Sequence, residues 1–399
     1  MKVAVVGPTH PFRGGASQHT TLLVQALRQR HDVFFASYSR QYLGWMYPGS
    51  TDRDPSALAV HQEPDMTFDA VKPWAWRRLA EVVAGQAPDL VVLPWTVTYW
   101  APFFYLFLRR LAATPRPPKT LFLCHNIVEH EESAVKRSIS RRVLGLADHF
   151  VTHSREDAAQ LRELLRLPDG SRIRTSPHPE YRHLNVRPID QASARRKLGI
   201  PGERVLLFFG FVRSYKGLEV LVEAMPLVLR QLPVHLVVAG EFWGGPRRFL
   251  ESLRKLGVES HVTTVPRFIP NEDVPDYFAA SDVVVIPYHS ATQSGIVQMA
   301  YGFDRPVVAT RVGGLPEVIR DTETGTLVPP RDPEALAEAI VDFFRNDRGP
   351  AMRAAIRGAR EEFSWDRMVE TIESFVTPKT SAEAGAHPST PDALRPPAR

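Results

Sequence analysis

Short apolar runs alternate with amphipathic stretches along almost the whole chain, and this alternation constrains the fold more than any other feature. A short apolar run bounded by turn residues is typical of a buried strand, and the stretches between the runs have helical spacing. Strands that alternate with helices form parallel sheets covered on both faces. The sequence therefore predicts an α/β fold with doubly wound sheets. The runs fall at residues 3–7, 33–37, 90–94, 120–124, 149–153, 205–210, 235–240, 261–265, 283–287 and 306–310.

The 399 residues are enough for about two domains. We place the boundary in the polar, proline-containing stretch 177–191, because the apolar run RVLLFFG after it opens a new sheet. This predicts a first Rossmann-like domain over residues 1–182 and a second over 183–376, with the last helix crossing back to the first domain. Residues 377–399 have the composition of a disordered tail. Two domains imply a cleft between them.

The composition excludes some classes of protein. No apolar stretch reaches the roughly 18 residues of a membrane span, and the opening MKVAVVG has a strand pattern instead of a secretory leader. The single cysteine, Cys124, cannot form an internal disulfide, so a cytoplasmic location is expected. The net charge of +5 suits phosphorylated ligands or a membrane surface. Nucleic acid is not an expected partner, because the basic residues are scattered and are not interleaved with aromatic ones.

Two loops that follow apolar runs carry candidate ligand-binding residues. Gly14 and Gly15 lack the Cβ that would keep a phosphate or sugar away, although a glycine pair also suits an ordinary tight turn. Arg213 and Lys216 follow the first strand of the second domain, where α/β sheets bind ligands. Two cations there could neutralise a diphosphate; the alternative is a solvated turn.

The stretch CHNIVEHEE, 124–132, contains two histidines and several carboxylates, but it lacks the four-residue ligand spacing of a helical metal site. We therefore assign no metal. His125 directly follows a strand and should reach the cleft, either as a ligand contact or as a hydrogen-bonded strand-end residue. His130 and the acidic residues 129–132 are expected in a solvated loop or a helix start.

The segment 95–111 is rich in aromatic residues and ends in Arg109 and Arg110. Because its apolar residues surround the helix and form no single stripe, we favour a core helix with a basic end. The alternative is a surface that touches lipid or an apolar acceptor.

With these pieces in order, the chain resembles the retaining glycosyltransferases of family four, which have the GT-B fold, two Rossmann-like domains facing across a cleft. The resemblance extends from Met1 to about Val376. It implies that Gly14 and Gly15 approach the transferred sugar and diphosphate, that His125 positions the sugar, and that Arg213 and Lys216 bind the diphosphate. The matching motifs are FRGGAS at 12–17, LCHN at 123–126, GFVRSYKG at 210–217, VVAGE at 237–241, SDVVVIPY at 281–288, VATRVGGLPEVI at 308–319 and GTLVPPRDP at 325–333.

The stretch 290–310 departs from the family pattern. Family members commonly carry two glutamates there, with seven residues between them, one near the donor sugar and one holding the nucleotide ribose. Alignment on Pro306 puts Ala291 and Met299 at these places, and a shift of one residue produces no acid. The helix N-terminus around Ser294 and Gly295 can still bind phosphate. As neutral replacements we consider Gln293 for the sugar and Gln298 for the ribose, and Glu317 is the nearest remaining acid, although it equally suits a helix start.

The resemblance therefore implies a retaining transferase that moves a sugar from a nucleotide-diphosphate sugar to a hydroxyl acceptor, in polysaccharide or glycolipid assembly, without a metal or other cofactor. The expected partners are the nucleotide sugar, a carbohydrate or lipid-linked acceptor, and the inner face of a membrane through peripheral contact. One alternative is a non-catalytic subunit of the same fold, which the missing glutamates motivate. Another is a sugar phosphorylase or epimerase, since a fold does not fix a function.

Overall fold

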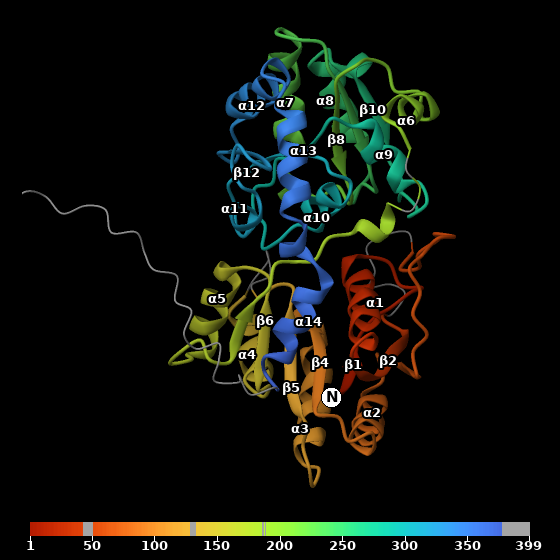
Figure 1. The fold of residues 1–399 in the computed structure, drawn as a ribbon, viewed down its shortest axis with the longest axis vertical. Coiled ribbons are helices and arrows are strands. Elements are labelled where there is room, and N and C mark those ends of the chain that lie inside the picture. The colour runs from red at the N-terminus through yellow and green to blue at the C-terminus, as the bar shows by residue number, and fades with distance from the viewer. Residues whose placement is uncertain (43–50, 128–132, 186, 188, 377–399) are drawn as a thin grey trace, which may run out of the picture.

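The protein is described by a computed structural model at residues 1–42, 51–127, 133–185, 187 and 189–376. These residues form two parallel sheets with helices on both faces, one above the other along the long axis of the molecule (Figure 1). The predicted α/β class is confirmed. The sequence interpretations of His130, of the acidic residues 129–132 and of the tail 377–399 lie outside the described residues.

The first sheet has the strand order β3-β2-β1-β4-β5-β6-β7, and all its neighbouring strands are parallel. Its strands are β1 (Lys2–Val6), β2 (Asp32–Arg40), β3 (Met66–Asp69), β4 (Leu90–Trp95), β5 (Lys119–Cys124), β6 (His149–Thr152) and β7 (Ile173–Thr175). The helices of this half are α1 (Gly15–Arg28), α2 (Pro73–Gly85), η2 (Thr98–Trp100), α3 (Ala101–Ala112), α4 (Ala134–Leu144) and α5 (Arg155–Leu165), and the 3₁₀ turn η3 (Arg182–Leu184) leads out of it.

The second sheet has the order β10-β9-β8-β11-β12-β13 and is also parallel. Its strands are β8 (Val205–Phe209), β9 (His235–Ala239), β10 (Val262–Val265), β11 (Val283–Ile286), β12 (Val307–Thr310) and β13 (Gly325–Val328). The helices are α6 (Gln191–Leu198), η4 (Ser214–Lys216), α7 (Leu218–Leu229), α8 (Arg247–Lys255), η5 (Glu259–His261), α9 (Val274–Ala280), α10 (Gly295–Gly302), α11 (Leu315–Val318), α12 (Pro333–Arg345), α13 (Gly349–Gly358), η6 (Arg360–Phe363) and α14 (Trp365–Glu373).

Burial explains why the apolar runs form the sheets. Every residue of β4, β8 and β9 is buried, as expected for central parallel strands with helices on both faces. The last helix, α14, lies against the first domain, where Met368 and Ile372 pack with Val3 and Leu23 (Figure 1). The chain therefore ends its second domain by returning to the first.

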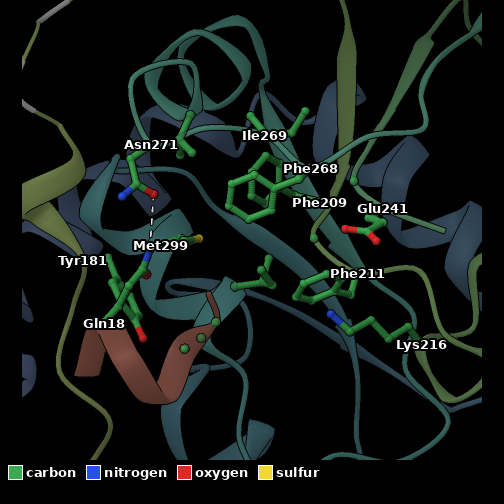
Figure 2. Close-up of a pocket in the computed structure, with 17 residues that line it drawn as sticks. Gln18, Tyr181, Phe209, Phe211, Lys216, Glu241, Phe268, Ile269, Asn271 and Met299 are labelled. Carbon is green, nitrogen blue, oxygen red and sulfur yellow. Dashed lines mark hydrogen bonds between the residues drawn. The ribbon is translucent and has the colours of Figure 1, made fainter. Parts of the chain in front are cut away.

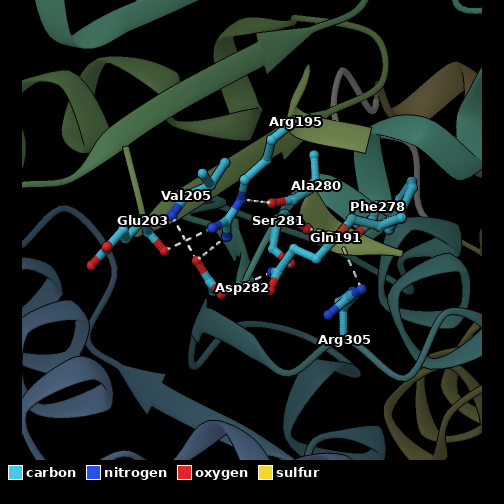
Figure 3. A network of polar contacts seen from close by, with 10 residues as sticks. Gln191, Arg195, Glu203, Val205, Phe278, Ala280, Ser281, Asp282 and Arg305 are labelled. Carbon is cyan, nitrogen blue, oxygen red and sulfur yellow. Dashed lines mark hydrogen bonds and ion pairs between the residues drawn. The ribbon is translucent and has the colours of Figure 1, made fainter. Parts of the chain in front are cut away.

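Helix α6 is held to the second sheet by a polar network around Asp282 (Figure 3). The Arg195 guanidinium donates to the Asp282 carboxylate at 2.8 Å and to the carbonyls of Ala280 and Glu203 at 2.9 Å each. The same carboxylate accepts the backbone N–H of Val205, the first residue of β8, at 2.7 Å. The network thus fixes the amino-terminal end of β8.

Candidate functional site

Two adjoining cavities lie where the carboxyl ends of the two sheets meet. The polar cavity, of about 730 Å³, is lined by Arg213, Lys216 and Ser294 of the second domain and by Thr96 and Asn126 of the first. Its volume is within the range of small-molecule sites in proteins, roughly 300–1,000 Å³. The apolar cavity beside it is lined by Gly14, Gly15 and Gln18 of the first domain and by residues of the second that include Phe209, Phe268, Asn271 and Met299 (Figure 2). Lys216, Gly295 and Ile296 line both cavities.

The two predicted cations, Arg213 and Lys216, lie together in the wall of the polar cavity. Within the described part of the chain neither forms an ion pair with a carboxylate; each lies over an aromatic ring instead. The Arg213 guanidinium carbon is 3.4 Å from the ring centre of Trp243, and Lys216 Nζ is 5.2 Å from that of Tyr288. Lys216 is only 8% exposed, and its burial lowers the pKa of its ammonium group. An anion that enters the cavity would therefore meet two cations whose charge is not neutralised by the protein.

Two helices begin at these cavities. Helix α1 begins at Gly15 and α10 begins at Gly295, and the ring of Tyr181 lies between them: its hydroxyl would be 3.9 Å and 3.8 Å from a Cβ added at the two glycines. Ser294 caps α10 by accepting the backbone N–H of Ile296 at 3.3 Å. Gly14 has φ +106°, a conformation that other residues rarely adopt. Helix N-termini carry partial positive charge, so both add to the field of the cations.

His125 lies in a cluster of four histidines at the carboxyl end of the first sheet. Its ring centre is 4.7 Å from that of His19, on α1, and 5.1 Å from that of His153, after β6; His178, after β7, lies 4.8 Å from His19. Burial lowers the pKa of His125 to about 3 and that of His178 to about 4, so both rings are neutral at neutral pH. Among the described residues, Nε2 of His125 is buried without a hydrogen-bond partner, and His125 does not line either cavity. A neutral imidazole can donate one hydrogen bond and accept one.

The other three candidates from the sequence have different positions. Gln293 lines the polar cavity, and its amide donates to the carbonyl of His153 across the domain boundary at 3.2 Å. Gln298 is fully buried and is not among the residues that line either cavity. Each helical residue is rotated by about 100° from the one before it, and the α10 face that meets the apolar cavity carries Gly295, Ile296 and Met299.

Glu317 does not line the two cavities either. Its carboxylate accepts the backbone N–H of Arg155 at 2.7 Å and that of Glu156 at 3.1 Å, at the first turn of α5 in the other domain. This is the helix-start role considered from the sequence, except that the helix belongs to the facing domain. Glu317 therefore joins the two domains beside the site.

Several site residues were not identified from the sequence, because their contacts join distant segments. The Gln18 amide donates to Asn271 Oδ1 at 3.2 Å across the apolar cavity (Figure 2), while Asn271 Nδ2 is buried without a partner among the described residues. Thr292 donates to Asn126 at 2.7 Å in the polar cavity. In the sequence these four residues share only a weak feature, because each follows a strand or lies near the start of a helix.

Arg13, which is buried, and Glu241, which is partly exposed, form an ion pair across the domain boundary, with the Arg13 guanidinium carbon 4.1 Å from the Phe268 ring centre. With the Gln18–Asn271 and Thr292–Asn126 hydrogen bonds, this pair holds the two domains in contact around the cavities. The apolar cavity is thus closed by both domains.

No helix in the described residues is long and apolar enough to cross a membrane. No group of three or more histidine, cysteine, aspartate or glutamate residues, among those whose positions are described, is arranged to hold a metal ion. This holds for the four clustered histidines, all of which are among the described residues.

Comparison with known proteins gives matches over both domains. The sequence profile of the family Glycosyltransferase Family 4 matches residues 13–179, and that of Glycosyl transferases group 1 matches residues 203–346. Among named relatives, the D-inositol 3-phosphate glycosyltransferase of Saccharomonospora viridis is 34% identical over 245 residues, which are 58% of this chain and 56% of the relative. That of Acidothermus cellulolyticus is 35% identical over 252 residues, 58% of this chain and 55% of the relative. The matched part thus spans little more than half of the length of these relatives.

Solved structures share the fold at lower identity. Sucrose-phosphate synthase from Thermosynechococcus elongatus superimposes with a TM-score of 0.71 at 19% identity, over 94% of this chain and 98% of that one. The Anabaena protein HepE, solved in complex with UDP, has a TM-score of 0.71 at 18% identity, over 94% of this chain and 100% of that one. The two-domain fold is therefore one that these solved structures share.

Proposed function

This chain belongs to glycosyltransferase family four, the glycosyl transferases group 1, and we propose that it is a retaining transferase that moves a sugar from a nucleotide-diphosphate sugar to a hydroxyl acceptor. One observation carries the proposal: Arg213, Lys216 and the start of α10 line one cavity that the first domain closes from the opposite side. Cations without carboxylate partners, next to a helix N-terminus, are the groups that bind a diphosphate.

In the proposed complex the nucleoside occupies the apolar cavity and the diphosphate lies at its junction with the polar one. The lining residues of the two cavities support this placement. Phe209, Phe268 and Ile269 offer apolar walls for a base, and Lys216 and Gly295 line both the apolar and the polar cavity. HepE, which shares this fold, was solved with UDP. The sugar then points into the polar cavity, toward Asn126 and Gln293.

The ribose contact is assigned to amides in place of a carboxylate. Met299 lines the apolar cavity where the family pattern has its second glutamate, and the polar side chains that share this cavity include Gln18 and Asn271. Because Asn271 Nδ2 has no partner within the described structure, it can donate to a ribose hydroxyl without breaking an existing bond. A carboxylate could only accept a hydrogen bond there.

The chemical step is departure of the diphosphate while the anomeric carbon gains positive charge. Arg213 and Lys216, with the α10 N-terminus, stabilise the charge that develops on the leaving oxygen; removal of one such preorganised donor typically costs roughly 3–4 kcal/mol. The family resemblance assigns to His125 the role of positioning the sugar by hydrogen bonding; its ring is neutral because of burial, and it precedes Asn126, which lines the polar cavity. The departing phosphate oxygen takes the proton of the acceptor hydroxyl, which attacks from the same face, so no enzymic nucleophile is assigned.

No metal is required in this mechanism, because Arg213 and Lys216 supply the positive charge. We expect full turnover in the presence of a strong chelator. Strict dependence on an added divalent cation would contradict the assignment of these two residues. The chelator experiment therefore tests the roles of the side chains as well as the cofactor.

The acceptor is placed at the first-domain side of the polar cavity, and the proposed setting is polysaccharide or glycolipid assembly at the cytoplasmic face of a membrane. The named relatives are D-inositol 3-phosphate glycosyltransferases. For peripheral membrane contact, the aromatic segment 95–111 offers little surface: Phe104, Phe107 and Leu111 of α3 are buried, while Arg109 and Arg110 are exposed at its end. Flotation with anionic liposomes at low salt tests this contact, and absence of flotation would remove it from the proposal.

The deciding experiment is a mass-spectrometric screen of the protein against a panel of nucleotide sugars, with Arg213→Ala and the surface variant Arg247→Ala. We expect slow release of a nucleoside diphosphate from one donor, lost in Arg213→Ala and kept in Arg247→Ala, because Arg247 has a side chain 89% exposed to solvent. Release of sugar 1-phosphate with phosphate as acceptor would indicate a phosphorylase. Neither turnover nor a thermal shift with any donor would favour a non-catalytic subunit.

A further inference from the structure

Arg213 is placed by a contact that the proposed function does not use directly. Its guanidinium carbon lies 3.4 Å from the ring centre of Trp243, and both side chains line the polar cavity. Trp243 follows β9, whereas Arg213 follows β8, so two separate loops meet here. An arginine over the face of an indole is attracted by the negative charge of the ring face.

The backbone keeps these two loops in register beyond the end of the sheet. Val212 N–H donates to the carbonyl of Glu241 at 2.9 Å, and Trp243 N–H donates to the carbonyl of Val212 at 3.2 Å. Val212 and Phe242 form a parallel bridge between the loops. The residue next to Val212 is Arg213, so the hydrogen bonds that fix Trp243 also fix the backbone that carries Arg213.

The indole also contacts a second aromatic ring. The ring of Phe211 contacts the ring of Trp243 edge to face, with centres 5.7 Å apart. Trp243 Nε1 is buried and finds no hydrogen-bond partner in the part of the chain that the structure describes, which costs free energy in the folded protein. An apolar residue of similar size would avoid this cost, so stability alone does not explain a tryptophan at this position.

We infer that Trp243 is a positioning residue that holds Arg213 at the diphosphate end of the polar cavity. This inference rests on the proposed function. A carboxylate could hold the guanidinium as firmly, but it would neutralise the positive charge and repel the diphosphate. The indole face orients the guanidinium and leaves its charge available to the leaving group.

The test compares Trp243→Ala and Trp243→Phe in steady-state kinetics of donor hydrolysis. Arg213 acts mainly on charge that develops as the diphosphate departs, so its misplacement lowers kcat more than it changes KM. For Trp243→Ala we expect kcat to fall about tenfold, the size of a partly desolvated cation–π contact. Trp243→Phe should stay within about twofold of the wild type, because the ring face is kept.

The controls separate positioning from folding. Trp74→Ala removes a tryptophan that is 66% exposed and should change neither kcat nor KM. The double variant Trp243→Ala/Arg213→Ala should be no slower than Arg213→Ala alone, because Trp243 acts only through Arg213. Equal tenfold losses in both backgrounds would show that Trp243 acts independently of Arg213 and would overturn the inference.

The outcomes also distinguish the inference from the proposed function. An active wild type whose kcat is unchanged in Trp243→Ala overturns the inference and leaves the transferase intact. A wild type that releases no nucleoside diphosphate from any donor overturns the proposed function, and the inference with it. If Trp243→Ala fails to fold, Trp243→Phe and Trp243→Leu decide: positioning predicts activity near that of the wild type for Phe and a loss of kcat for Leu.

Discussion

Two arginines of the second domain, Arg195 and Arg213, have opposite surroundings although both are at least half-buried. The Arg195 guanidinium is paired with Asp282 and donates to two backbone carbonyls (Figure 3). The Arg213 guanidinium lies on Trp243 and has no carboxylate partner in the described residues. The N–H donors of Arg195 are used within the fold, whereas those of Arg213 are available to a ligand. The partners of a buried arginine, more than its residue type, indicate whether it serves structure or binding.

The largest expected effect is that of Arg213→Ala on turnover. We expect kcat for donor hydrolysis to fall about 10²–10³-fold, because a preorganised donor to the leaving group is removed. The melting temperature should change little, since no carboxylate is left without its partner. Both quantities are measured on one preparation, by donor hydrolysis and by thermal unfolding. A large loss of stability with little loss of turnover would mean that Arg213 serves the fold and not the ligand.

Arg195→Ala should show the opposite pattern. It leaves Asp282, whose side chain is 17% exposed, without its cation, and loss of one partner of a buried pair costs about 3 kcal/mol. Turnover below the unfolding transition should stay close to that of the wild type. Urea unfolding gives the free energy of unfolding, and kinetics at low temperature give kcat. A stable Arg195→Ala protein with reduced kcat would mean that the network acts on the site.

The histidine cluster adds a third case, groups that could be cations but are kept neutral. The folded pKa values of His125 and His178, about 3 and about 4, lie below the unfolded value of about 6.5. Between these values the unfolded chain binds more protons, so stability is lost as the pH falls below about 6.5. From pH 7 to pH 5 we expect a loss of about 2 kcal/mol for each of these histidines.

Urea unfolding at several pH values measures this loss. His178→Gln, which removes one titrating ring, should make the dependence of stability on pH less steep by about one proton. Stability that stays flat from pH 7 to pH 5 would mean that the cluster opens to solvent or accepts protons in the folded state.

The smallest expected effect concerns the amide pair of the apolar cavity. Gln18→Ala removes the bond to Asn271 and should weaken the binding of the matching nucleoside diphosphate about fivefold, the size of one neutral hydrogen bond. Gln25→Ala, on the same helix but with its amide bonded to His61, is the matched control. Titration calorimetry of the wild type and the two variants, with the ribonucleoside diphosphate and with its 2′-deoxy form, measures these affinities. Equal affinities of Gln18→Ala and the wild type would remove this amide from the nucleotide site.

All ten strands predicted from apolar runs are present within a few residues, but three further strands were not predicted. These are β3, β7 and β13, and each lies at the edge of its sheet. An edge strand is covered less completely, so its residues need not form an apolar run: β7, with the sequence Ile-Arg-Thr, buries only Ile173. The sequence pattern therefore identified the sheet centres and one edge, β10, and missed the other edges.

The candidate site divides in a similar way. Arg213, Lys216 and Gly295 could be selected from the sequence because their place after a strand or at a helix start follows from local pattern, and both cavities contain residues from these loops. Gln298 and Met299 are adjacent in sequence, yet only Met299 lines a cavity, because one step along a helix rotates a side chain by about 100°. The orientation of α10 on its sheet decides which of the two side chains lines the cavity.

Local pattern by itself determined the α/β class, the two sheets and the cationic loop, because strand burial, helix spacing and loop position depend on residues close together in the chain. Tertiary structure alone decided that Arg213 rests on Trp243, that Gln18 meets Asn271 and that Glu317 caps a helix of the facing domain. Each of these contacts joins segments from different loops or different domains. The distance between such segments is set by the packing of whole sheets, which no local sequence pattern encodes.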